Sequence, residues 1–237
     1  MFTVNHADVF EAIYRSRGKD WAQEAQDIVT EIRARFPESD SLLDVACGTG
    51  IHLEHFAETF GYCEGVDYAE PMLELAAQRV PNVPLHLGDM RKFDLGRKFD
   101  AITCMFCSIG YLDTVDDMRD AVRTMVEHLV PGGVLAIEPW WFPEQFLDGY
   151  VAGDLSRGDD RTITRISHSI RQGDKTRMEL RYVIGSAEEG ITEFTEIEIL
   201  SLWTKEEYES AFTDAGCPVE YITGGPTGRG LFVGVRK

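Results

Sequence analysis

Residues 44–50 read Asp-Val-Ala-Cys-Gly-Thr-Gly, and this stretch decides the fold. The mostly apolar run over residues 41–46 is typical of a buried strand, and Leu53 and Phe56 indicate a helix after the glycines. A glycine turn between a strand and a helix lets the backbone approach a ligand and aims the amino end of the helix at it. Open α/β sheets bind their ligands at such strand ends. Residues 44–50 therefore predict a ligand-binding loop.

Strand and helix patterns alternate along the first 140 residues. A helix begins at Pro71, a favoured residue in a first helical turn, and another ends before Pro131-Gly132-Gly133. Such alternation predicts an α/β fold, a parallel sheet with helices on both faces. The expected strands cover residues 41–46, 62–66, 84–87, 99–106 and 134–137.

The pattern changes in the second half of the chain. Apolar and polar side chains alternate with a period of two over residues 161–171, 175–184 and 191–203. This period predicts three antiparallel strands. A helix over residues 205–215 and two last strands, at 219–223 and 231–235, are expected to return to the core.

The chain length of 237 residues fits one large domain with an insertion. We expect a core made of residues 1–140 and 204–237 and an inserted antiparallel lid made of residues 141–203. Within the core, residues 1–36 are expected to be a helical lid at the amino end, and Pro37 ends its second helix.

The chain is strongly acidic, with 41 acidic and 23 basic residues and a formal net charge of −18. Phosphate backbones and anionic lipid surfaces repel such a protein, so we expect no nucleic-acid and no membrane partner. The longest apolar stretch, residues 101–112, is too short to cross a bilayer. The five cysteines show neither a disulfide framework nor a convincing metal spacing, so we expect no metal site and a reduced, cytoplasmic protein. A homodimer is compatible with the sequence, which does not fix the oligomeric state.

Two acidic residues follow the expected second and third strands. Asp67 lies seventeen residues after Gly50, where an acidic side chain suits a ribose diol, and Asp89 follows Gly88. Leu53 occupies the third glycine position of the dinucleotide fingerprint, which disfavours a nicotinamide cofactor.

These residues resemble the motifs of a known family. Residues 44–50, Asp67, the Gly88-Asp89 pair and residues 129–133 (Leu-Val-Pro-Gly-Gly) are similar in order and spacing to class I S-adenosylmethionine-dependent methyltransferases. The resemblance covers residues 40–140 and implies a Rossmann-like sheet with S-adenosylmethionine as the cofactor.

The resemblance also implies which residues hold that cofactor. It places the glycine loop under the methionine part, Asp67 on the ribose hydroxyls, and Asp89 with Met90 around the adenine. Ala46 stands where the family usually has glycine, and alanine is small enough to keep the close approach. The implied cofactor residues are Arg17, Trp21, Ala46, Gly48, Asp67, Tyr68, Met72, Asp89, Met90 and Met105.

A closer resemblance extends over nearly the whole chain. Residues 14–21, 105–111, 138–141 and 228–231 look like those of N,N-dimethyltransferases that act on nucleotide-linked 3-amino deoxysugars, in macrolide pathways such as those of desosamine and mycaminose. This resemblance implies an enzyme of the EC 2.1.1 class that dimethylates the C3 amine of a thymidine-diphosphate (TDP)-linked 3-amino-deoxyhexose.

An anionic substrate is also suggested by a basic island. Residues 157–181 contain seven basic and four acidic residues, and arginine pairs well with phosphate oxygens. The alternative is that these strand arginines point outward and only solvate the lid. By resemblance, Arg229 is the favoured single phosphate ligand. The expected substrate residues are Tyr14, Glu138, Trp140, Arg157, Ser167, His168, Arg177 and Arg229.

The expected chemistry is an in-line displacement at the sulfonium methyl by the neutral amine. Holding the reactants in line supplies most of the available catalysis. Tyr14 and Tyr111 are the candidate catalytic residues, expected to orient the amine, because tyrosine is a poor base at neutral pH. Two alternatives stay open: a methyltransferase for another small acceptor, such as a polyketide hydroxyl or an amino acid, and a non-catalytic protein that binds S-adenosylmethionine.

Overall fold

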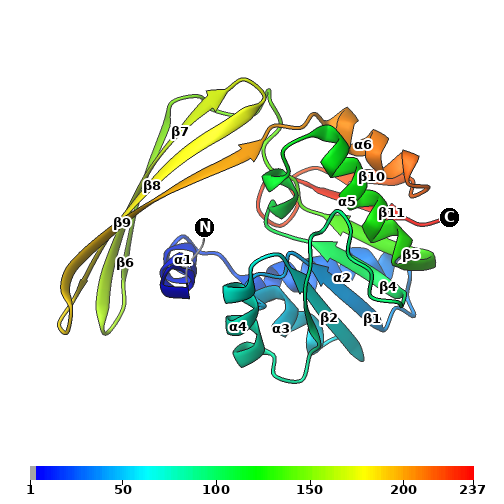
Figure 1. Cartoon of the computed structure of the whole chain (residues 1–237), viewed down its shortest axis with the longest axis horizontal. Coiled ribbons are helices and arrows are strands. Elements are labelled where there is room, and N and C mark those ends of the chain that lie inside the picture. The colour runs from blue at the N-terminus through cyan, green and yellow to red at the C-terminus, as the bar shows by residue number, and fades with distance from the viewer. Residues whose placement is uncertain (1–3) are drawn as a thin grey trace.

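The computed structural model describes residues 4–237 and contains two separate sheets (Figure 1). The larger sheet has seven strands in the order β10-β11-β5-β4-β1-β2-β3. Its strands are β1 (Ser41–Val45), β2 (Tyr62–Asp67), β3 (Leu85–Leu87), β4 (Phe99–Cys104), β5 (Leu129–Ile137), β10 (Val219–Ile222) and β11 (Leu231–Val235).

The first five strands pair in parallel, and β11 pairs antiparallel with β5 and with β10. β1 lies between β2 and β4, so the strand order reverses direction there. The crevice outside the carboxyl ends at such a reversal is where open α/β sheets bind ligands. The loop at residues 44–50 follows β1 and therefore lies at this position.

Helices cover both faces of the large sheet (Figure 1). α2 (Trp21–Arg35), α3 (Ile51–Ala57) and α4 (Glu70–Arg79) lie on one face, and α5 (Val115–Glu127) and α6 (Lys205–Asp214) lie on the other. Two buried clusters result, one with Ile28 and Phe56, the other with Met125 and Phe212. Three of these helices, α2, α5 and α6, begin at a side chain that accepts a backbone N–H, such as Thr204 in the capping box of α6.

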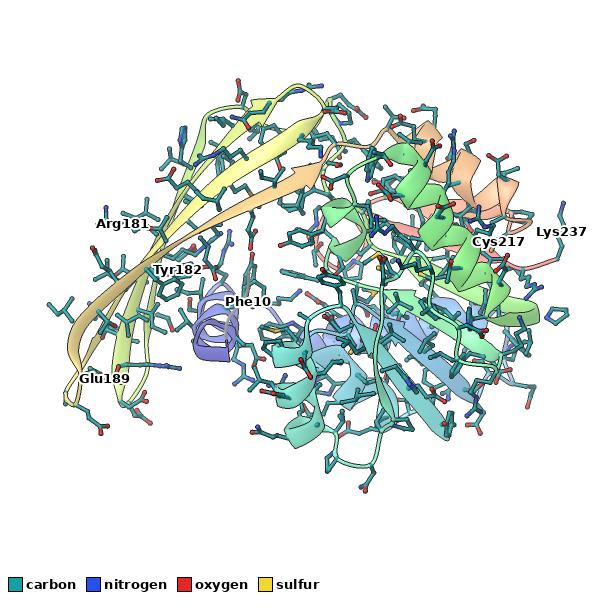
Figure 2. All side chains as sticks on the ribbon, in the orientation of Figure 1. Phe10, Arg181, Tyr182, Glu189, Cys217 and Lys237 are labelled. Carbon is teal, nitrogen blue, oxygen red and sulfur yellow. The ribbon has the colours of Figure 1, made fainter. Side chains whose placement is uncertain are left out.

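The second sheet has four antiparallel strands, where the sequence indicated three. They are β6 (Tyr150–Arg157), β7 (Arg161–Gln172), β8 (Lys175–Ser186) and β9 (Gly190–Ser201). β6 was missed because it is an edge strand whose residues include Gly153 and Asp154, types that are depleted in strands. Figure 2 shows Arg181 on the outer side of this sheet and Tyr182 on the side toward the first helix.

The helix α1 (Val4–Ser16) lies between the four-stranded sheet and the core (Figure 1). Val9 and Ile13 pack in one buried cluster with Ile163, Leu180 and Leu200 of the lid. Of the helical lid predicted over residues 1–36, α1 alone has this position, because α2 packs on α3 and the core sheet. No helix within the described residues is long and apolar enough to cross a membrane.

Candidate active site

A cavity of about 1270 Å³ lies between the large sheet, α1 and the four-stranded sheet. Its volume exceeds the roughly 300–1,000 Å³ that a typical small-molecule site occupies, so it has room for two ligands. Most residues predicted for the site line it: Tyr14, Arg17, Trp21, Ala46, Gly48, Asp67, Tyr68, Met72, Asp89, Met90, Met105, Tyr111, Trp140, Ser167 and Arg229.

The loop after β1 forms the floor of the cavity. Its residues Ala46, Gly48 and Gly50 have φ values of 58°, 54° and 75°, all in the left-handed region. A Cβ on Gly48 would meet no atom within 4 Å, so the backbone of this residue borders open space. Ala46 adopts the left-handed conformation at a cost of about 1 kcal/mol. The loop thus forms the turn expected from its glycines, with one alanine held in a glycine-like conformation.

Asp67 is fixed at the end of β2 by the same loop. Its Oδ2 accepts the Gly48 N–H at 2.8 Å, and its Oδ1 accepts the Ala69 N–H at 2.8 Å. Burial raises the pKa of this carboxyl, and the backbone donors oppose that rise. A carboxylate oxygen has two lone pairs, so both oxygens can still accept a ribose hydroxyl. The geometry suits the role expected from the sequence.

Asp89 lies farther along the same cavity. The Arg91 guanidinium donates to its carboxylate at 2.6 Å and to Asp117 at 2.7 Å. The hydrogen bonds from Arg91 lower the pKa of Asp89, so this carboxyl stays ionised. Tyr68, which directly follows Asp67 on the loop after β2, is 78% exposed and lines the same cavity. An ionised acceptor beside an aromatic face fits a base with an exocyclic amine.

A buried network of Lys19, Glu24 and His52, three residues that were not predicted for the site, also lines the cavity. The Lys19 Nζ donates to both Glu24 carboxylate oxygens at 2.5 and 2.6 Å, and His52 contacts the same carboxylate at 3.1 Å. Burial lowers the pKa of Lys19, and Glu24 opposes this change. Lys19 also lies above the Trp21 ring at 5.6 Å. The predicted Arg17 lines the cavity but pairs with Asp154 of β6 at 3.3 Å.

The turn after β4 is also strained, at two successive residues. Phe106 and Cys107 have φ values of 51° and 59°, unusual for residues with side chains. The Phe106 ring lies 5.0 Å from the Tyr14 ring and 4.1 Å from the Lys19 ammonium. Met105 directly before it is buried and lines the cavity. Left-handed conformation at a phenylalanine leaves no mark in a sequence, so this residue was missed.

Glu138 lies behind the cavity wall and not on it, contrary to the substrate contact predicted for it. It is fully buried and accepts the Phe106 N–H at 2.7 Å and an Arg229 N–H at 2.7 Å. The Thr227 hydroxyl donates to the same carboxylate. Glu138 therefore positions the strained turn and Arg229, which does line the cavity.

The basic island divides between the two faces of the four-stranded sheet. Arg165 of β7 lines the cavity and pairs with Asp154 at 2.9 Å. The predicted Arg157, His168 and Arg177 lie outside the cavity, because they alternate with the residues that face inward. Arg177 instead pairs with Glu179 at 3.2 Å on the outer face.

Two guanidinium groups in the wall have unused donors. Among the described residues, neither the Nε of Arg165 nor that of Arg229 has a hydrogen-bond partner, although both atoms are buried. Unpaired buried donors are costly, so each such group calls for an acceptor. The Arg165 guanidinium lies 6.0 Å from the centre of the Tyr14 ring, and that of Arg229 lies 5.3 Å from the Phe106 ring, which is itself 5.0 Å from the Tyr14 ring. Each guanidinium is paired with a carboxylate, Asp154 or Glu138, and still offers a free N–H donor to the part of the cavity beside Tyr14.

The two candidate tyrosines lie under the lid. Burial raises the pKa of Tyr14 and raises that of Tyr111 well above its usual value. Both therefore stay protonated at neutral pH and can donate or accept hydrogen bonds without acting as free bases. The carboxyl group of Glu198, on β9, lies beside Tyr111 and was not identified from the sequence. No group of three or more metal-ligating side chains is found over residues 4–237.

The chain resembles known methyltransferases along its whole length. Residues 42–133 match the family model described as a methyltransferase domain. A Streptomyces venezuelae dTDP-3-amino-3,4,6-trideoxy-alpha-D-glucopyranose N,N-dimethyltransferase is 53% identical over 99% of each chain. A Saccharopolyspora spinosa dTDP-4-amino-2,3,4,6-tetradeoxy-D-glucose N,N-dimethyltransferase is 50% identical, covering 100% of this chain and 95% of the relative.

A solved structure supports the same assignment. The S-adenosylmethionine-bound amino pentose methyltransferase CalS10 of Micromonospora echinaspora superposes with a TM-score of 0.92 at 55% identity, covering 97% of each chain. The glycine loop, Asp67 and Asp89 fit this cofactor in position and chemistry. S-adenosylmethionine is therefore the cofactor. The chain belongs to the S-adenosylmethionine-dependent N-methyltransferases, in the group that contains these sugar N,N-dimethyltransferases.

Proposed function

We propose that this enzyme transfers two methyl groups to the C3 amine of a TDP-linked 3-amino-deoxyhexose, a step of desosamine-type sugar biosynthesis. The names of the two relatives support this proposal, since both act on dTDP-linked amino sugars. They differ in the ring position of the amine. The C3 position rests on the resemblance at residues 14–21 and 105–111.

The pair of buried guanidinium groups at Arg165 and Arg229 is the observation that supports an anionic group in the substrate. Each lines the cavity with an Nε that lacks a partner among the described residues. Arginine pairs with phosphate oxygens in a forked geometry, so a diphosphate matches these free donors. In a chain of net charge −18, two guanidinium groups with free buried N–H donors in one cavity are a specific feature.

The mechanism follows from placing the amine against a methyl donor. S-adenosylmethionine, when bound, supplies an electrophilic methyl group on sulfur. Asp67 and Asp89 hold its ribose and adenine, while Tyr14 and Tyr111 orient the amine by hydrogen bonds. The four-stranded sheet and α1 exclude water and keep the reactants in line, which is the main source of rate acceleration for such a displacement. Residues 141–203 thus serve as the substrate lid.

Mass spectrometry of the reaction products tests this function. The enzyme is incubated with S-adenosylmethionine and either a 3-amino or a 4-amino dTDP-deoxyhexose. We expect the 3-amino sugar nucleotide to gain one and then two methyl groups faster than the 4-amino one. If neither sugar nucleotide gains a methyl group although the enzyme binds S-adenosylmethionine, the sugar-nucleotide assignment is wrong. Acceptors without a phosphate group would then be tested.

The diphosphate contact has its own test in a matched pair of variants. Arg165→Gln removes a cation from the cavity wall, and Arg177→Gln removes one from the outer face of the same sheet. We expect the first to raise the KM for the sugar nucleotide about tenfold or more, the equivalent of one charge-assisted hydrogen bond, and the second to leave it unchanged. Equal KM values for both variants would exclude Arg165 as a phosphate ligand.

We further propose that a second copy of the chain covers the outer face of the four-stranded sheet. Exposed apolar side chains gather there, and the Arg177–Glu179 and Arg181–Glu193 pairs neutralise the charges among them. A nearly neutral apolar face lets two copies of an acidic chain meet without strong repulsion. The exposed residues are Val151, Leu155, Ile166, Val183, Ile191, Ile197 and Ile199.

Sedimentation velocity tests this homodimer. Ile197→Lys places a charge in the apolar face, and Leu87→Lys places one at an exposed apolar residue of the core as a control. We expect the wild type and the control to sediment as dimers and Ile197→Lys as a monomer. A monomeric wild type refutes the proposal.

A further inference from the structure

Glu198 places a carboxyl group in the cavity wall, and the mechanism above gives it no part. It lies on β9 two residues before the buried Leu200, so both side chains face inward. The Tyr111 hydroxyl hydrogen-bonds this carboxyl. Tyr111 is 44% exposed although protein surrounds it, because that surface faces the cavity. The cavity therefore contains a tyrosine hydroxyl with a carboxyl group directly beside it.

Two successive methyl transfers to one amine require a group that accepts a proton before each transfer. An aliphatic amine has a reference pKa of about 8–10 and enters the cavity protonated at neutral pH. Nitrogen must lose a proton before it can attack the methyl group. After the first transfer the nitrogen is again an ammonium, so the same loss is needed before the second.

We propose that Glu198 accepts the proton of the substrate amine through the Tyr111 hydroxyl, before each methyl transfer. This inference rests on the proposed function. As the ammonium N–H bond breaks, its proton bonds to the Tyr111 oxygen, and the Tyr111 proton passes to the Glu198 carboxylate. The products of this step are a neutral amine with a free lone pair, an unchanged tyrosine and a carboxylic acid. The acid returns the proton to solvent between transfers.

The surroundings of Glu198 suit a carboxyl group that exchanges protons near neutral pH. Burial, together with the nearby Glu196 carboxylate, raises the pKa of Glu198 to about 7, and Arg165 opposes the rise. A carboxyl at its ordinary value of about 4.3 would be too weak to compete with the amine. Burial keeps Tyr111 protonated, so it relays a proton without becoming charged. Among the described residues, the titratable groups that face Glu198 are Tyr14, Cys107, Tyr111, Arg165, Tyr182 and Glu196.

The pH dependence of kcat for each methylation step tests the proposal. Glu198→Gln keeps the shape of the side chain but cannot accept a proton, and Glu198→Asp keeps a carboxyl group. Glu196→Gln is the control, because Glu196 lies on the same strand and the same face but does not line the cavity. For the wild type we expect kcat to rise with pH through about 7. In Glu198→Gln we expect this rise of kcat with pH, the acidic limb of the profile, to disappear and kcat to fall about 100-fold. Glu198→Asp and Glu196→Gln keep the limb.

Proton release on binding gives a readout that does not depend on turnover. Titration calorimetry without S-adenosylmethionine, in buffers of different ionisation enthalpy, counts the protons exchanged when the amino sugar nucleotide binds. We expect the pH dependence of this count to change near pH 7 in the wild type and to lose that change in Glu198→Gln. If Glu198→Gln folds poorly, Tyr111→Phe provides the second test, because it breaks the same relay.

The outcomes separate this inference from the proposed function. An active wild type together with Glu198→Gln of unchanged pH profile and proton count overturns the role of Glu198 and leaves the function intact. A wild type that methylates no amino sugar nucleotide overturns the proposed function and this inference with it. Loss of the limb in Glu198→Gln, with its retention in Glu196→Gln, supports the relay.

Discussion

Replacing Arg229 is expected to destabilise the fold as well as the substrate complex. Glu138 is 0% exposed and the Arg229 side chain 11% exposed, with a 2.7 Å hydrogen bond between them. Removing one partner of a buried ion pair costs about 3–5 kcal/mol, because it leaves an uncompensated charge. For a chain of this size, 1 kcal/mol lowers Tm by about 2–4 °C, so Arg229→Ala should lower Tm by about 6–20 °C.

Differential scanning calorimetry at neutral pH measures this change. The matched control is the double variant Glu138→Gln/Arg229→Met, which removes both charges and should recover most of the lost stability. Arg229→Ala with a Tm within about 2 °C of wild type would refute this reasoning, since one kcal/mol corresponds to at least that shift. In that case the Phe106 N–H and the Thr227 hydroxyl would be sufficient to stabilise the Glu138 carboxylate.

Three further predictions follow from the described contacts. Asp67→Ala removes the carboxylate that accepts the Gly48 N–H and the ribose hydroxyls, and should raise the Kd for S-adenosylmethionine about 10–100-fold. Titration calorimetry measures this Kd, and an unchanged value would show that Asp67 does not bind the ribose. Burial raises the pKa of Asp44 to about 6, so its ionisation should cost stability as pH rises from about 4 through 6. Asp44→Asn should therefore gain about 3 kcal/mol at pH 8 relative to wild type, and an equal Tm at pH 8 contradicts this. Burial also raises the pKa of all five thiols, those of Cys47, Cys63, Cys104, Cys107 and Cys217. A thiol reagent at pH 8 should therefore label these cysteines only after unfolding, and rapid labelling of the native protein would contradict this.

The core of the fold was predictable because local sequence signals decide it. The glycine loop, Asp67 and Asp89 each follow a strand at a fixed place, and the structure puts all three on one cavity. The carboxyl ends of neighbouring parallel strands meet at one edge of the sheet, so their order in the chain is sufficient to bring them together.

Which lid residues face the cavity could also be predicted from the alternation along each strand. Ser167 and His168 were both predicted to contact substrate, but adjacent residues of a strand point to opposite faces. Ser167 shares its face with the buried Ile163 and Arg165, and that alternation identifies Arg165 as the inward arginine. The strain at Phe106 could not have been found, because it depends on contacts between distant segments.

The origin of the cavity walls has a consequence for enzyme engineering. The floor comes from residues 41–137, which also supply Tyr111, and the turn at residues 226–229 supplies Arg229. The rest of the wall around the acceptor comes from α1 and residues 138–204, which leave the core after β5 and return before α6. Val9 and Ile13 of α1 pack on the inserted sheet, and Arg17, directly after α1, pairs with Asp154, so α1 and the sheet fit each other as well as the substrate. A chimera that takes both pieces from a relative should change its acceptor and keep its cofactor affinity. Much of the acceptor wall thus resides in two exchangeable segments that have to be transplanted together, while Tyr111 and Arg229 stay with the core.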